Sequence, residues 1–219
     1  MAVLVILRSG QTSACNYVAQ MKTGAKEVAV ERIDAATPNP RARTTGCVYL
    51  LYFLTAILGQ TLASPRLMAL GEALTLISFG FYVVLSLLFY LLFKPVSRLV
   101  SLIAALFSLV GCGLGVLGLF HRAPAQVTPL WFFGRYCIMI GYLILRSTFL
   151  PRLLGWLMVI AGFAWVAYLL PQVAKLLSIP IEGLGILAEA ALMLWLLVKG
   201  VNVARWTEQA SAARKYIRA

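Results

Sequence analysis

Charged side chains are scarce in this sequence. Only 12% of the 219 residues are Asp, Glu, Lys or Arg, whereas 62% are hydrophobic. A soluble domain carries about 25% charged residues, and a chain of this length leaves roughly 30% of its surface exposed after folding. So much apolar surface cannot be hidden from water. The composition therefore predicts a protein whose partner is a lipid bilayer.

The residues on which common catalytic chemistries depend are also few. The chain has one histidine, His121, and one aspartate, Asp34, which excludes two-histidine haem ligation and zinc sites of the HExxH type. Neither a glycine-rich loop ending in Gly-Lys-Ser/Thr nor a Gly-x-Ser-x-Gly motif is present. We therefore expect no metal and no cofactor, and an enzyme is a minority interpretation. No Cys-x-x-Cys spacing joins the four cysteines, so no disulfide framework is expected: Cys15, Cys47, Cys112 and Cys137.

The net charge of +12 lies in short junctions between apolar runs and at the two ends of the chain. A nucleic-acid-binding surface would need a basic face interleaved with aromatic residues, and the sequence has none. Basic junctions beside anionic lipid headgroups explain the charge better. Nucleic acid is therefore excluded as a partner.

Six apolar runs approach the ~20 residues that cross about 30 Å of hydrocarbon. Prolines interrupt them, because proline lacks the amide proton and clashes with the preceding helical turn. The sequence predicts an all-α fold, a polytopic transmembrane bundle of six helices. The predicted spans are residues 46–63, 67–93, 96–120, 128–145, 153–170 and 181–198.

Three parts follow from these spans: a polar cytoplasmic tail over 1–45, a transmembrane domain over 46–201, and a basic cytoplasmic tail over 202–219. The second tail either continues the sixth helix or lies along the headgroups. Fifteen of the 19 lysines and arginines fall on the side of the two tails, and Arg135 falls within a span. The excess predicts a multi-pass inner-membrane protein with both termini in the cytoplasm. Only three basic residues fall outside: Arg66, Arg122 and Lys175.

Three ionisable residues lie deeper than one helical turn inside the predicted spans, in the hydrocarbon region, where they are costly and usually pair or face a cavity. At 1.5 Å per residue, Glu72, Arg135 and Glu189 lie about 8, 10 and 12 Å below the outer surface. We hypothesise that one or both glutamates pair with Arg135 and form the floor of a polar cavity open to the outside. The alternative is an ion pair that only fixes helix register. Three further residues are candidates for the cavity rim: Gln60, His121 and Glu182.

These residues leave three functions open. The first is a non-enzymatic membrane protein that binds a small or lipidic ligand in the cavity. The second is a small ion-coupled transporter in which Glu72 or Glu189 titrates, although no internal repeat supports it. The third is an intramembrane enzyme with two carboxylates in one pocket. The sequence does not indicate the oligomeric state.

Two stretches carry a family resemblance: residues 132–157 read FFGRYCIMIGYLILRSTFLPRLLGWL and residues 189–201 read EAALMLWLLVKGV. They resemble a bacterial membrane-protein family known as domain of unknown function 4386, and the likeness extends over roughly residues 41–202. It implies about six helices and no established activity. Independently of the resemblance, the residues around Pro151 predict a cytoplasmic hairpin in which Arg146 and Arg152 lie at the lipid headgroups. The family-motif residues are Arg146, Ser147, Pro151, Arg152, Gly155, Trp195, Lys199 and Gly200.

Overall fold

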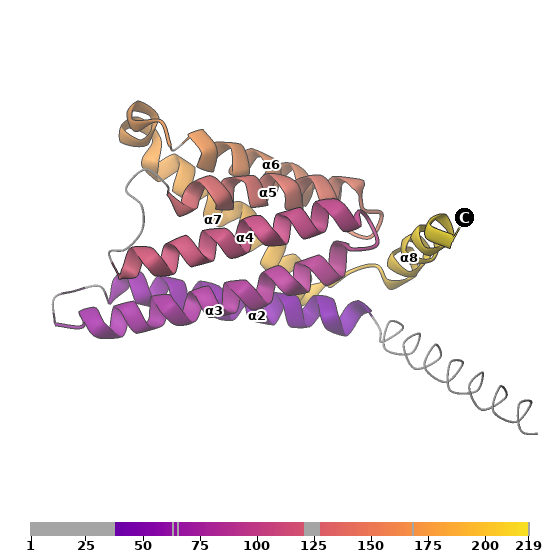
Figure 1. The fold of residues 1–219 in the computed structure, drawn as a ribbon, viewed down its shortest axis with the longest axis horizontal. Coiled ribbons are helices and arrows are strands. Elements are labelled where there is room, and N and C mark those ends of the chain that lie inside the picture. The colour runs from indigo at the N-terminus through magenta and orange to yellow at the C-terminus, as the bar shows by residue number, and fades with distance from the viewer. Residues whose placement is uncertain (1–37, 63, 65, 121–127, 168, 219) are drawn as a thin grey trace, which may run out of the picture. The chain divides into compact units, whose positions relative to one another are not determined.

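The computed structural model describes residues 38–218, apart from 63, 65, 121–127 and 168 (Figure 1). Most of the predicted tail over 1–45 therefore lies outside the described residues. Within the described part every regular element is a helix and no strand is present, which confirms the predicted all-α class. The seven helices are α2 (Pro38–Thr61), α3 (Met68–Phe93), α4 (Arg98–Leu119), α5 (Pro129–Arg146), α6 (Arg152–Ala167), α7 (Pro171–Val198) and α8 (Val203–Arg218).

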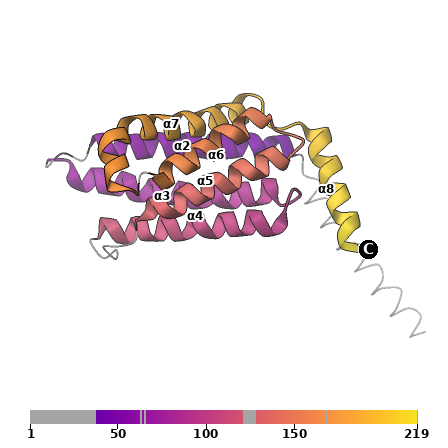
Figure 2. The same ribbon diagram turned by 90° about the horizontal axis from the view of Figure 1, so that it is seen from above.

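Helices α2 to α7 form a closed ring. Each packs against the helix before and after it in the sequence, and α7 returns to pack against α2. The six helices run lengthwise beside one another, whereas α8 crosses one end of the bundle (Figure 2). Short connections between antiparallel neighbours explain the sequential order. A ring of this kind has an interior, and the interior holds the candidate site.

The outer surface of the ring is apolar. Leucines such as Leu70, Leu87 and Leu106 are about half exposed, at 49%, 49% and 52%. A water-soluble protein does not expose so continuous an apolar surface. Four of the described helices, α2, α3, α4 and α7, are long and apolar enough to cross a membrane, and α6 is a shorter apolar helix. The chain is a multi-pass membrane protein.

Two helices begin earlier than expected. Helix α2 starts at Pro38, inside the segment predicted as a tail, and α7 starts at Pro171, inside the predicted break over 171–180. Proline is tolerated in the first turn, where its missing N–H has no partner within the helix. The internal Pro180 does disturb α7, because the backbone at Leu177 leaves the helical region at φ −126° and ψ 19°. Helix α7 therefore consists of two helical segments that meet at a kink at Leu177.

Paired glycines bring α5 and α6 into backbone contact. A Cβ atom on Gly141 would lie 2.7 Å from the carbonyl oxygen of Gly155, and one on Gly162 would lie 2.7 Å from that of Gly134. In each helix the two glycines are seven residues apart, so they lie on one face. Such small residues let helices approach closely in membranes. Gly155 of the family motif thus has a packing role.

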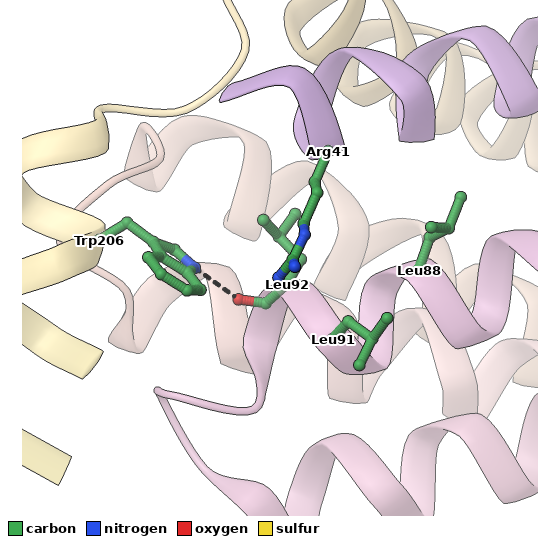
Figure 3. Close-up of a pocket in the computed structure, with 5 residues that line it drawn as sticks. All are labelled: Arg41, Leu88, Leu91, Leu92 and Trp206. Atoms are coloured by element: carbon green, nitrogen blue, oxygen red, sulfur yellow. Dashed lines mark hydrogen bonds between the residues drawn. The ribbon is translucent and has the colours of Figure 1, made fainter. Parts of the chain in front are cut away.

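The predicted tail over 202–219 folds into α8, which does not continue α7. The chain turns at Gly200, whose φ of 69° favours glycine. The indole Nε1 of Trp206 then donates a hydrogen bond to the carbonyl oxygen of Leu92, 3.0 Å away, at the end of α3 (Figure 3). The Gln209 Nε2 donates to the Arg146 carbonyl oxygen at 3.3 Å. These bonds hold α8 against the ends of α3 and α5.

The glycine contact gives a test of helix packing. In Gly141→Ala the new methyl group meets backbone that cannot move away, and we expect a loss of about 1–3 kcal/mol of stability. Gly113→Ala is the matched control, since a Cβ there meets nothing within 4 Å and alanine is the better helix former by about 1 kcal/mol. Thermal melting in detergent should fall for the first and hold or rise for the second. Equal melting temperatures would contradict the close contact.

Candidate functional site

A half-open cavity lies inside the ring, toward the bundle end where α2 and α6 finish and α3, α5 and α7 begin. It has two adjoining lobes of about 310 and 270 Å³. We call it the Glu189 cavity. Both lobes are lined by five of the same residues: Tyr52, Gln60, Leu130, Trp165 and Glu189.

Glu189 on α7 is held by neighbours from two other helices. The Tyr49 hydroxyl of α2 donates to its Oε2 at 3.0 Å, and the Cys137 thiol of α5 approaches its Oε1 at 3.9 Å. Tyr49 and Cys137 are themselves almost fully buried. In the described part of the chain, no lysine or arginine forms a salt bridge with Glu189. The carboxylate therefore relies on two donors and on whatever occupies the cavity.

Aromatic rings form much of the cavity wall. Tyr52 and Tyr82 meet edge to face, with ring centroids 4.7 Å apart, and Tyr82 meets Phe133 in the same way at 5.2 Å. Phe53 and Trp165 also line the cavity. Each such pair adds about 0.5–1.5 kcal/mol beyond area burial. The wall thus combines aromatic rings with a few polar groups.

The structure does not join Glu72, Arg135 and Glu189. Glu72 is exposed on α3. The Arg135 guanidinium lies over the Trp131 ring, 3.3 Å from its centroid, and donates to the Trp131 carbonyl oxygen at 3.1 Å. An equal depth in the membrane is not enough for these residues to pair. Each side chain must also lie on the face of its helix that is turned toward the partner.

Two of the predicted rim residues do lie around the Glu189 cavity. Gln60 at the end of α2 and Glu182 on α7 line the lobe that Glu189 also lines. Glu182 precedes Glu189 by seven residues, or about 10 Å along the helix. His121, the third predicted rim residue, lies outside the described residues. The cavity therefore carries one acidic side chain deep inside and another near its mouth.

Sequence reasoning missed Tyr49, Tyr52, Tyr82 and Cys137. A signal was present, because all four lie within predicted spans, where a hydroxyl or thiol needs a partner. Within the described residues, no group of three or more metal-ligating side chains was found.

The family-motif residues lie at the opposite end of the bundle. Ser147 caps α5, its hydroxyl donating to the Ile144 carbonyl oxygen at 2.8 Å. The Lys199 ammonium lies 5.8 Å from the Trp195 ring centroid, and the Arg146 guanidinium 6.0 Å from that of Tyr142. These contacts close helix ends and anchor loops. They do not reach the Glu189 cavity.

A second hollow lies at this closed end, beneath Trp206. Arg41, Leu88, Leu91 and Leu92 complete its lining (Figure 3). Its volume of about 20 Å³ is close to the space that a single water molecule needs. It is therefore too small for an organic ligand, and the Glu189 cavity is the candidate site.

The apolar exterior and the internal polar cavity define a multi-pass membrane protein with a candidate ligand site. A family model described as "Domain of unknown function (DUF4386)" matches residues 120–200, so this part of the chain is similar to that family, as the sequence motifs predict. The match covers α5, α6 and α7, including Glu189, whereas the α2 and α3 walls of the cavity lie outside it. Searches of the curated proteins and of the solved structures found no match to the chain.

The contacts of Glu189 and Arg135 predict unequal effects of substitution. Tyr49→Phe removes a hydrogen bond to a buried acid, which typically contributes about 1.5–3 kcal/mol when the acceptor is charged. Arg135→Gln removes a cation–π contact at a partly exposed site, which contributes about 0.5–1 kcal/mol. We expect thermal melting in detergent to fall clearly for Tyr49→Phe and little for Arg135→Gln. The reverse order would indicate that Arg135, not Tyr49, supports the buried carboxylate.

Proposed function

We propose that the protein is a non-enzymatic inner-membrane protein that binds a small-molecule or lipidic ligand in the Glu189 cavity. The observation that carries the proposal is a cavity of about 310 Å³ with the half-buried carboxylate of Glu189 at its floor. Ligand sites typically have volumes of about 300–1,000 Å³ and combine apolar walls with a few placed polar groups. Tyr52, Trp165 and Glu189 provide this combination.

The proposal includes six membrane spans with both termini in the cytoplasm. Helix α5 carries Arg135 and α6 has only 16 residues, so neither is as clear a span as the four longer helices. Both nevertheless belong to the same ring and pack closely against each other, which supports counting them as spans. The 16 residues of α6 cover about 24 Å, and local bilayer thinning accommodates such a length. Basic residues favour the α8 end as the cytoplasmic face: Lys94, Arg98, Arg146, Arg152, Lys199 and Arg205.

Cysteine labelling tests this orientation. In a chain whose four native cysteines are replaced by serine, we expect Ser64→Cys, between α2 and α3, to react with a membrane-impermeant maleimide applied to intact cells. Lys94→Cys, at the other end of α3, should react only after the membrane is opened. Labelling of Lys94→Cys in intact cells would reverse the orientation, and labelling of both would contradict an intact span between them.

Filling the cavity tests ligand binding. Ala56 lines one lobe, and Ala56→Trp should occupy the space and displace a bound molecule. Ala73→Trp is the matched control, because Ala73 is exposed on α3 and does not line the cavity. In native mass spectrometry we expect a co-purified adduct on the wild type and on Ala73→Trp, and its loss from Ala56→Trp. Identical spectra for all three would count against a ligand in this cavity.

An ion-coupled carrier is the second candidate. The break in α7 at Leu177 favours it, because discontinuous helices often border transport sites. Glu189 would then carry the coupled ion. Proteoliposomes under an imposed pH gradient distinguish the two functions, since a carrier shows flux that Glu189→Gln abolishes, whereas a binding protein shows none.

A further inference from the structure

Glu189 lines the cavity named after it without forming an ion pair with any described lysine or arginine. Glu182 and Glu189 both line it, and none of its described lining residues is lysine, arginine or histidine. A carboxylate held away from water usually has a cationic partner or binds one. Tyr49 and Cys137 offer Glu189 two donors but no charge. A cationic ligand in the cavity would supply the positive charge that the described lining lacks.

We infer that the ligand is a small organic cation whose ammonium group binds at Glu189 against the Tyr52 and Tyr82 rings. The inference rests on the proposed function and specifies its ligand class. The π faces of aromatic rings attract cations within about 6 Å, most strongly when both are shielded from water. A carboxylate beneath an aromatic wall therefore suits an ammonium group with apolar substituents.

The wall does not suit a bare metal ion. Calcium takes six to eight oxygen ligands, and magnesium requires near-octahedral geometry. The described lining offers only two carboxylates, Glu182 and Glu189, two helical turns apart and thus unable to share one ion. Nor does a proton explain the wall, because a proton needs no ring surfaces and no space of about 310 Å³. An organic cation uses the acid, the rings and the volume together.

Matched pairs of cationic and neutral probes test the charge requirement. Choline and 3,3-dimethylbutan-1-ol have nearly the same shape, as do 2-phenylethylammonium and 2-phenylethanol, but only the first of each pair is charged. With the full chain in phosphatidylglycerol nanodiscs, calorimetric titration should give at least one cation an affinity about tenfold or more above its neutral partner. Equal affinities in both pairs, or no binding by either cation, would overturn the inference.

Variants assign the effect to the cavity. Glu189→Gln keeps the shape and the acceptor for Tyr49, and it should weaken cation binding about tenfold while leaving the neutral probe unchanged. Tyr52→Leu removes a ring face and should weaken the cation more than the neutral probe. Glu72→Gln is the matched control, since Glu72 is an exposed acid outside the cavity lining, and it should change neither. Loss of cation binding in Glu72→Gln, or its retention in Glu189→Gln, would contradict the assignment.

Two further experiments are needed. One distinguishes a lipid headgroup from a soluble ligand, and the other distinguishes failure of the cation inference from failure of the proposed ligand site. Adding phosphatidylethanolamine to the nanodiscs should reduce the choline affinity if a lipid headgroup is the natural occupant, and leave it unchanged if the ligand is soluble. Should both neutral probes bind as well as the cations, with Ala56→Trp abolishing all binding, the charge inference fails while the ligand site stands. If Ala56→Trp changes nothing, the site itself fails.

Discussion

The contact between α2 and α7 is the constraint on which the ring depends. A Cβ atom on Gly46 would lie 2.7 Å from the Leu197 backbone nitrogen, and the Tyr49–Glu189 hydrogen bond joins positions 140 residues apart. All other neighbours in the ring are consecutive helices joined by short connections. This contact joins the first and last helices of the ring, so it closes the longest loop and costs the most chain entropy. It also places the Glu189 carboxylate beside α2, which contributes Tyr49 and the lining residue Tyr52.

The two ends of the ring differ in how their interior is filled. Toward α8, large side chains such as Phe89, Phe93 and Leu143 are almost fully buried, and α8 covers the end through Trp206. Toward the other end, the aromatic rings stand around a space instead of filling it. Tight packing at one end fixes the helix positions, so the walls at the open end keep their separation without a filled core.

The sequence predicted the all-α class and the approximate positions of the apolar helices, but not the rotation of each helix about its own axis. Run lengths and prolines located the helices, because apolar length is a physical requirement of the bilayer. Depth alone also placed Gln60, Glu182 and Glu189 toward the same end of the bundle. It could not tell that Arg135 turns to Trp131 while Cys137, two residues later, faces Glu189. Two residues differ by about 200° around a helix, so only the packed ring decides which of them faces inward.

The position of Glu189 within α7 argues that the acid serves a ligand more than the fold. Ala188, Leu192 and Leu196 are fully buried on the inner side of α7, so the helix already has an apolar seam that packs into the ring. Replacing a buried charged group with a well-packed hydrophobic residue is often neutral or stabilising, and a leucine at 189 would extend this seam. The carboxylate instead requires the Tyr49 hydroxyl and leaves the adjoining space open. A packing role would favour neither feature, whereas recognition of a charged molecule requires both.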